Sequence, residues 1–226
     1  MKSFVILKNG LCALVAAVSI HHAQAEFTLN SVFTDNMVLQ RDQPLMVWGT
    51  ATVGEVISIR FDSQTYSATA DANGDWDIPI GAYSANATPQ AMTISSPVSL
   101  SQTLNNILIG DLWVCSGQSN MEWRISSVAS QYDQQAYLDA NEANTNLRML
   151  NLANLQNATE QDDVTIKFIN GVQSWMVNGQ SGYDEISAVG YAFCMETLKQ
   201  QGVPVGLIHA NKGATGIAKW LPGAEG

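Results

Sequence analysis

The chain has 226 residues, of which 46% are hydrophobic and 13% charged, with 20 acidic against 10 basic residues. This length allows one large or two modest domains with a sizeable core, and the even spread of aromatic residues excludes a disordered or fibrous protein. The net charge of −10, without a cluster of basic residues beyond the N-terminus, argues against nucleic acid or an anionic membrane surface as a partner.

The first 25 residues are predicted to be a signal peptide. Lys2 and Lys8 give a positive start, residues 11–20 are apolar, and residues 23–25 read Ala-Gln-Ala, which is typical of a cleavage site. A transmembrane helix needs about 20 apolar residues, whereas this run breaks at His21. We therefore expect a secreted or periplasmic protein that has no membrane contact after cleavage. A retained N-terminal anchor is the alternative.

Removal of this segment changes which residues are available for chemistry. Two of the three histidines leave with it, so His209 is the only histidine after residue 25. Cys115 and Cys194 remain, and export permits a disulfide between them. Because Cys115 lies in a strand-like apolar run and Cys194 on the apolar side of an expected helix, two buried free thiols are the favoured interpretation.

Residues 26–109 have the pattern of an antiparallel β-sandwich. Short runs rich in β-branched and aromatic residues are separated by turn residues at intervals of about 8–15 residues. The runs are 46–48, 56–61, 65–69 and 92–94. Asn73 and Gly74 can supply the two positive-φ residues of a type I′ hairpin. Trp48 and Trp76 could contact a sugar, but packing in the core is the favoured interpretation, and we find no evident catalytic set in this segment.

From Gly110 the pattern changes to alternating strand and helix. Residues 107–115 predict a strand that is buried on both faces. Ser187 is placed to cap a helix with apolar residues at helical spacing, Gly202 fits its C-terminal cap, and residues 204–208 predict the next strand. This order indicates an α/β layer with a parallel sheet.

The segment between these elements gives a weaker signal. Within residues 124–186, a helix is expected at 134–141 and a strand at 147–152.

A serine follows the first buried strand of this second region. Ser119 lies in a turn that contains Gly117, at the carboxyl end of the predicted strand, where open α/β folds bind ligands. Backbone N–H groups at the start of a following helix would favour an oxyanion, as in the nucleophile elbow of hydrolases. The alternative is that Ser116 and Ser119 only cap that helix, and spacing alone does not decide between the two.

The sequence around Ser119 closely resembles the nucleophile segment of the sialate O-acetylesterase family, within the SGNH hydrolase superfamily. The similarity covers residues 110–122, which read GDLWVCSGQSNME. Residues 32–49 resemble the N-terminal signature of that family, and segments at 186–193 and 203–220 follow in the family's order. The resemblance spans nearly the whole chain after residue 25 and is weakest in the middle.

The resemblance implies a β-sandwich followed by a flavodoxin-like hydrolase domain that removes O-acetyl groups from sialic acid or related sugars. The implied mechanism is acyl transfer without a metal or other cofactor: Ser119 attacks the acetyl carbonyl, a histidine takes its proton, an aspartate orients that histidine, and backbone N–H groups hold the oxyanion. Gly213 matches a glycine that is a candidate for shaping the oxyanion pocket. Gln118, Asn120 and Thr215 are candidate polar pocket residues, with local turn hydrogen bonding as the alternative.

One departure from the family lies in this glycine turn. The family's Trp-Gly-Gly-Thr segment is Lys212-Gly213-Ala214-Thr215 here. Ala214 carries a Cβ, which is penalised at positive φ, so the turn is expected to be reshaped. Lys212 brings a cation that could favour an anionic substrate, although a solvated lysine is the favoured interpretation.

The second departure is an absence. The superfamily supplies its acid and base as an Asp-x-x-His pair, and no such sequence occurs in this chain. His209 matches a pocket position rather than the catalytic histidine. We therefore expect an N-terminal portion of a secreted enzyme, divided into residues 1–25, 26–109 and 110–226, that lacks its base and is inactive alone, with the remaining strands and the pair beyond Gly226.

Two other functions stay open. One is a non-catalytic carbohydrate-binding or degenerate protein, and the other is an acetyl xylan esterase-like enzyme that acts on plant polysaccharide.

Overall fold

The computed structural model describes residues 27–154, 159 and 161–216. The predicted signal peptide therefore lies outside the described residues. Within the described part of the chain, we find no helix that is long and apolar enough to cross a membrane.

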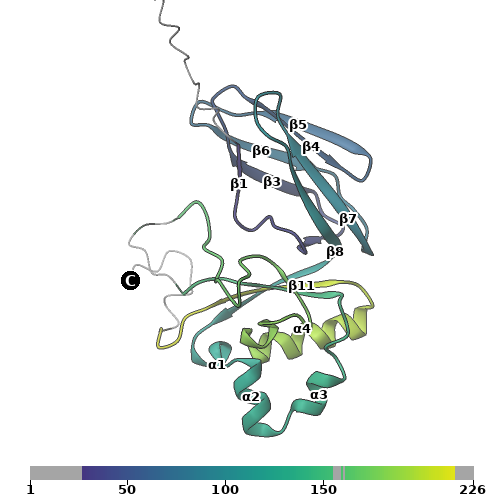
Figure 1. Ribbon diagram of the computed structural model, residues 1–226, viewed down its shortest axis with the longest axis vertical. Coiled ribbons are helices and arrows are strands. Elements are labelled where there is room, and N and C mark those ends of the chain that lie inside the picture. Colours follow the sequence, from purple (N-terminus) through teal and green to yellow (C-terminus); the bar gives the residue numbers. More distant parts are fainter. Residues whose placement is uncertain (1–26, 155–158, 160, 217–226) are drawn as a thin grey trace, which may run out of the picture.

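Two layers form the N-terminal half, which we call the β region, and their strands are antiparallel except for β2, which pairs in parallel with β8 (Figure 1). The strands are β1 (Thr28–Leu29), β2 (Val38–Gln40), β3 (Leu45–Thr50), β4 (Val56–Phe61), β5 (Gln64–Thr69), β6 (Asp75–Ile80), β7 (Asn86–Ser95) and β8 (Gln102–Gly117). One sheet has the order β1-β3-β6, while β5, β4, β7 and the first half of β8 belong to a larger sheet. Inward residues such as Val47, Ile59 and Ile78 share one core, because side chains alternate along each strand.

The two tryptophans of this region have different surroundings. Trp76 is 2% exposed and belongs to the core, as predicted. Trp48 is 39% exposed, so the prediction that it is a core residue is wrong. It follows the buried Val47 on β3 and therefore points to the opposite face of the sheet. There it packs edge-on against Phe33, with 4.7 Å between the ring centroids.

The turn at residues 71–75 also differs from the prediction. It connects β5 to β6, which belong to different sheets, so it does not close a hairpin. Gly74 has a φ of 88°, whereas Asn73 is not in the left-handed region. The carboxylate of Asp71 accepts hydrogen bonds from the N–H groups of Asn73 at 2.8 Å and Asp75 at 3.0 Å. Because this side chain closes the turn, one left-handed residue is enough.

The second half of the described chain, which we call the α/β region, is built on the end of β8. Its other strands are β9 (Leu147–Asn151), β10 (Met176–Val177) and β11 (Val205–Asn211), and its helices are α1 (Ser119–Glu122), α2 (Ile125–Tyr132), α3 (Gln135–Asp139), the 3-10 helix η1 (Tyr183–Glu185) and α4 (Ala188–Gln201). β11 lies between β8 and β9 and is parallel to both. The predicted fold class, antiparallel strands followed by a parallel α/β layer, is confirmed.

Local signals explain several of these elements. Ser187 caps α4 by accepting a hydrogen bond from the N–H of Gly190 at 3.1 Å, and Gly202 ends the helix with a φ of 68°. The expected helix at 134–141 and strand at 147–152 correspond to α3 and β9. α2 was not predicted.

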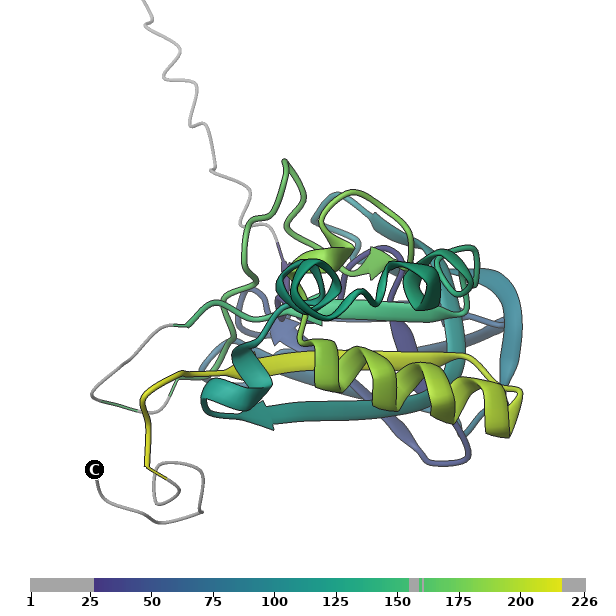
Figure 2. The same ribbon diagram turned by 90° about the horizontal axis from the view of Figure 1, so that it is seen from below.

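The parallel strands are covered on both faces. Seen from below, the helices lie in front of β8, β11 and β9 (Figure 2). Leu147 and Leu207 pack in the core on the helix side, whereas Leu150, Ile166 and Trp175 belong to the core of the β region. All five residues of β9 are buried, including the polar side chains of Arg148 and Asn151.

The two free cysteines lie in the helix-side core. Cys115 on β8 and Cys194 on α4 are both buried. A hydrogen bond from Cys194 lowers the pKa of Cys115 against the opposing effect of burial, and the same bond raises the pKa of Cys194.

β8 joins the two regions as one continuous strand. Residues 102–109 pair with β7 and β2, and residues 111–117 pair with β11, so the expected domain boundary falls inside a strand. Gly110 lies at this change of partner. A Cβ there would be 1.9 Å from the carbonyl oxygen of Pro204, which leaves room only for glycine.

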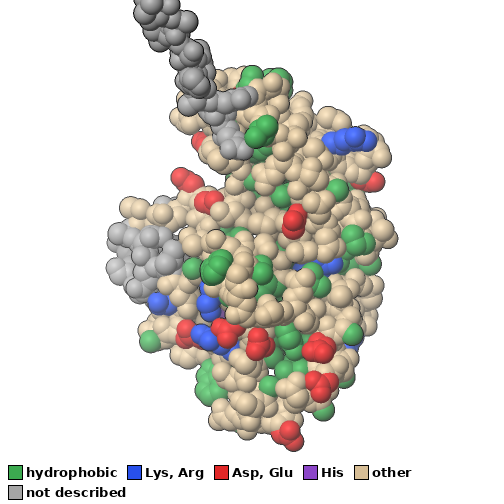
Figure 3. All heavy atoms as spheres, in the orientation of Figure 1, with side chains coloured by type: hydrophobic (Ala, Val, Ile, Leu, Met, Phe, Trp, Pro, Cys, Tyr) green, Lys and Arg blue, Asp and Glu red, His purple; other side chains and the backbone are tan. Residues whose placement is uncertain are grey.

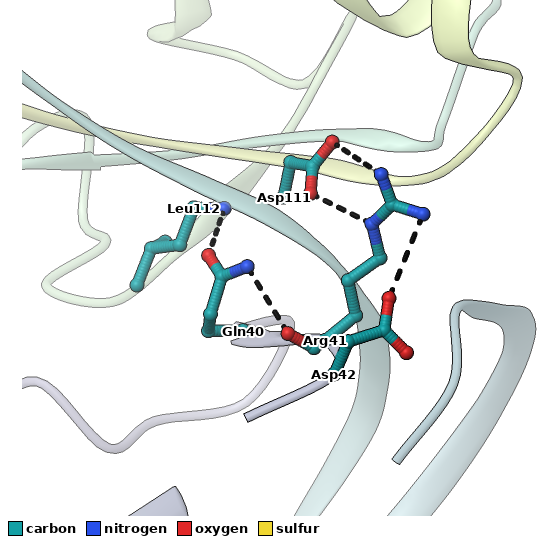
Figure 4. A network of polar contacts seen from close by, with 5 residues as sticks. All are labelled: Gln40, Arg41, Asp42, Asp111 and Leu112. Carbon is teal, nitrogen blue, oxygen red and sulfur yellow. Dashed lines mark hydrogen bonds and ion pairs between the residues drawn. The ribbon is translucent and has the colours of Figure 1, made fainter. Parts of the chain in front are cut away.

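Segments far apart in the sequence meet at this junction (Figure 4). Arg41 donates to both carboxylate oxygens of Asp111, at 2.8 Å and 3.2 Å, and this pairing raises the pKa of the guanidinium. Gln40 accepts a hydrogen bond from the N–H of Leu112 at 2.9 Å. The N-terminal signature and the segment before Ser119 are therefore in direct contact.

A second polar link crosses the junction without a carboxylate. Arg148 on β9 is buried and donates to the carbonyl oxygens of Thr145 at 2.7 Å, Asn36 at 3.3 Å and Asn106 at 3.3 Å. Burial lowers its pKa to about 10. The guanidinium thus connects β9 to two turns of the β region through neutral acceptors.

Candidate active site

Ser119 is the first residue of α1, at the carboxyl end of β8. Gly117 has a φ of 145°, and Gln118 is the N-cap residue. The side-chain oxygen of Gln118 accepts hydrogen bonds from the backbone N–H of Ser119 at 2.9 Å and from its Oγ at 2.7 Å. The N-cap is therefore neither Ser116 nor Ser119. Ser119 is exposed, and its hydroxyl is held by a neighbouring amide rather than by a histidine.

An open cavity of about 450 Å³ lies beside this serine. Its lining residues are Ser119, Glu122, Trp123, Arg124, Ser127 and Gln131, from α1, α2 and the residues between them. The cavity gives a solvent-borne ester direct access to the hydroxyl.

The turn at residues 212–215 lies against the turn that precedes Ser119. The N–H of Lys212 donates to the carbonyl of Gly117 at 3.0 Å. A Cβ on Gly213 would be 2.0 Å from Oε2 of Glu122, so a side chain here would have to displace this flexible carboxylate. Ala214 has a φ of 60°, so it adopts the left-handed conformation in spite of its Cβ, at a cost of about 1 kcal/mol or more.

The other candidate pocket residues are used differently. The hydroxyl of Thr215 donates to the carbonyl of Lys212 at 2.7 Å, and Gln118 contacts Ser119, so both side chains make local turn bonds. Asn120 is exposed on α1. Lys212 is half-buried, and its Nζ lies 3.5 Å from the carbonyl oxygen of Asn154, so it is not the fully solvated lysine that we expected.

His209 contacts the backbone near the serine, and the hydroxyl of Ser119 is bonded to Gln118. His209 lies on β11, is 2% exposed, and its Nε2 is 3.1 Å from the carbonyl oxygen of Met121. Its Nδ1 has no hydrogen-bond partner among the described residues. Burial lowers the pKa of His209, against an opposing effect of the Met121 carbonyl, so the ring is neutral at pH 7.

A second, smaller cavity of about 120 Å³ lies next to the first and shares Glu122 and Arg124 with it. Nη1 of Arg124 is 2.8 Å from Oε2 of Glu185, and Nζ of Lys167 is 3.7 Å from the same oxygen. Lys212 is a third cation beside Arg124 and Lys167. These three cations and the carboxylates of Glu122 and Glu185 form a charged group close to the serine. Figure 3 shows such blue and red side chains gathered on the α/β region, beside the grey residues.

Sequence reasoning missed this charged group. Arg124 lies two residues after the recognised segment, and Lys167 and Glu185 come from the middle of the chain, where the pattern was weak. Only the fold brings them together. Within the described ranges, we find no cluster of three or more histidine, cysteine or acidic side chains that could hold a metal ion.

Comparison with known proteins identifies relatives over both regions. Residues 109–226 match the model of a family of carbohydrate esterases described as sialic acid-specific acetylesterases. A sialate O-acetylesterase of Mus musculus is 23% identical over 93% of this chain and 40% of its own, and that of Homo sapiens is 25% identical over 87% and 39%.

A solved structure shares the fold. The crystal structure of a carbohydrate acetylesterase from Xanthomonas citri superposes with a TM-score of 0.77 and 29% identity, over 86% of this chain and 42% of that one. The chain thus spans about two-fifths of the length of these relatives. Since the family model covers more than half of the chain, the protein belongs to the carbohydrate esterase family of sialic acid-specific acetylesterases.

Proposed function

We propose that this chain carries the nucleophile and part of the substrate pocket of an esterase that removes O-acetyl groups from sugars, with sialic acids as the favoured substrates. The main support is the position of Ser119. It is exposed at the carboxyl end of a parallel strand, opens into a cavity, and has the turn of Gly213 beside it. Family membership supports ester hydrolysis as the chemistry.

In the proposed mechanism, Oγ of Ser119 attacks the acetyl carbonyl carbon, gives up its proton to solvent and forms a tetrahedral intermediate. The C–O bond to the sugar then breaks, the sugar leaves as an alcohol with a proton from solvent, and water hydrolyses the acetyl-serine to acetate and the free serine. The N–H groups of Ser119 and Gly213 are the candidate oxyanion donors. The side-chain oxygen of Gln118 accepts hydrogen bonds from both the N–H and the hydroxyl of Ser119, so this side chain must turn away before the serine can react.

The proton acceptor is the missing part of this site. His209 is buried, and its Nε2 contacts a backbone carbonyl, so we propose that it lines the pocket and does not serve as the base. The sequence contains no Asp-x-x-His pair. We therefore propose that the chain alone reacts only slowly, through nucleophile and oxyanion pocket without general base catalysis.

The leader sequence supports a secreted or periplasmic location.

The charged group beside Ser119 supports an anionic sugar. Arg124, Lys167 and Lys212 outnumber Glu122 and Glu185, although the protein as a whole is acidic. A carboxylate on the substrate would therefore find a favourable field at this place. A neutral acetylated polysaccharide such as acetyl xylan gains nothing from these cations.

The proposal is tested with 4-nitrophenyl acetate, an activated acetyl ester that needs little help from a base. We expect slow release of 4-nitrophenol above the buffer rate, which Ser119→Ala abolishes. Ser130→Ala on α2 is the matched control, because its exposed hydroxyl contacts only Ser127. His209→Asn should leave the rate unchanged. A rate that Ser119→Ala does not alter would favour the non-catalytic carbohydrate-binding alternative.

A further inference from the structure

A second cleft, of about 450 Å³, lies at the outer face of the β1-β3-β6 sheet. Met46, Trp48 and Thr50 alternate outward along β3 and form one wall of it. Ser119 is on α1 in the other region, so this cleft is separate from the candidate active site (Figure 1).

The strand register places carboxylates beside an exposed indole ring. On β6, Asp77 stands opposite Trp48, and Asp75 stands opposite Thr50. Side chains in such cross-strand pairs have Cβ atoms about 4.5–5.5 Å apart. The cleft therefore offers a flat apolar surface with hydrogen-bond acceptors along one side.

The opposite wall comes from the α/β region and is fixed in place. Asp162 and Asp163 line the cleft. The carboxylate of Asp163 accepts hydrogen bonds from Ser31, from its N–H at 3.0 Å and its Oγ at 2.8 Å, and the carbonyl of Asp162 accepts one from Asn30 at 3.1 Å. The two walls are thus held together before any ligand binds, which lowers the entropic cost of binding.

The polar groups of this cleft are mainly acceptors. Among the described residues, the carboxylates of Asp75, Asp77 and Asp162 form no ion pair. Sugar hydroxyls donate hydrogen bonds to carboxylates. The C–H face of a pyranose ring packs on an aromatic side chain, because both have an apolar face and a polar edge. An anionic sugar would be repelled by the four carboxylates.

We propose that this cleft is a binding subsite for a neutral sugar unit, with Trp48 as the stacking surface and Asp77 as a hydroxyl acceptor. The subsite does not depend on the esterase chemistry, because none of its residues contributes to the cavity at Ser119.

Lactose is a suitable neutral probe, and N-acetylneuraminic acid is the anionic comparison. In two-dimensional ¹H–¹⁵N NMR spectra of the chain, millimolar lactose should shift the indole signal of Trp48, and the acid should not. Trp48→Ala should weaken lactose binding by about tenfold. Asp77→Asn should weaken it by about threefold, because a neutral amide is a poorer acceptor than a carboxylate.

The matched control is Trp113→Ala. Trp113 is 42% exposed and packs edge-on against Phe193 at 5.0 Å, just as Trp48 packs against Phe33, but it belongs to the α/β region. Trp113→Ala should leave lactose binding unchanged, and thermal unfolding should confirm that Trp48→Ala and Trp113→Ala are both folded. The proposal is overturned if lactose causes no shift, if the shift survives Trp48→Ala, if the anionic sugar binds equally well, or if calcium chloride alone perturbs the cleft and lactose does not.

Discussion

The β region and the α/β region present opposite charges at their two clefts. Residues 27–109 contain seven acidic and two basic residues, and the cleft beside Trp48 has carboxylates on both walls. In the α/β region, three cations gather near Ser119. The same acidic chain thus separates the cleft that we propose for a neutral sugar from the cavity that we propose for an anionic one. The charge around each cleft therefore says more about the ligand to expect there than the net charge of the chain does.

This comparison rests on a junction that holds the two regions together. The largest effect is expected from Gly110→Ala, because its Cβ would be 1.9 Å from a backbone oxygen that cannot move freely. We expect a loss of about 3 kcal/mol or more in the free energy of unfolding, measured by urea denaturation. Gly216→Ala, with no atom of the described residues within 4 Å of the added Cβ, is the control and should change it by less than about 0.5 kcal/mol.

A smaller but still large effect is expected from Arg148→Met. The substitution keeps much of the volume and leaves the carbonyls of Asn36 and Asn106 without their donor, which should cost about 2–4 kcal/mol. Urea denaturation of the variant measures this loss. Arg60→Met on the exposed side of β4 should be nearly neutral. Equal effects of the two substitutions would mean that the junction does not depend on the buried guanidinium.

The α/β region should respond to acid through His209. Its pKa is lowered from the usual 6.5 by burial, so below about pH 6.5 the unfolded chain binds a proton that the folded chain resists. The stability contributed by the neutral ring is present above this pH and is lost as the pH falls. Between pH 7.5 and 5.5, His209→Gln should therefore lose about 1 kcal/mol less than the parent chain. Parallel pH profiles in urea denaturation would contradict this assignment.

The smallest effect is expected from Arg124→Gln. Removal of this exposed cation should weaken the binding of N-acetylneuraminic acid by only about threefold, and by less at high salt. Lactose binding should not change. Titrations of both sugars, followed by NMR, test the charge difference between the clefts directly. Lys199→Gln on α4 serves as the control for net charge. A change in lactose binding with Arg124→Gln would show that the two clefts are not independent.

Much of the fold could be predicted from local signals. The β-branched run of β4, the cap at Ser187 and the apolar runs of β8 and β11 each act through neighbouring residues, and these elements are present. The prediction that residues 107–115 are buried on both faces is wrong for the end of that run, because Trp113 is 42% exposed and Val114 is 64% exposed. The prediction for the Asn73 turn was wrong because the side chain of Asp71 closes it. The pairing of Arg124 and Lys167 with Glu185 could not be predicted, since it depends on where distant segments meet.

The candidate site shows the same division. The recognised segment located Ser119 at a strand end, but not that Gln118 holds its hydroxyl. The position of His209 after the last predicted strand was clear, whereas its contact with the Met121 carbonyl depends on how α1 packs on β11.

The central claim is that Ser119 is an acyl acceptor, and the most direct measurement is to locate the transferred acetyl group. After reaction with 4-nitrophenyl acetate and rapid quenching in acid, peptide mass mapping should find one acetyl group on the peptide that contains Ser119. Ser119→Ala should lack this adduct, and Ser130→Ala should retain it. A chain that carries no acetyl group on Ser119, or acetyl groups only on lysines, would contradict the proposed nucleophile.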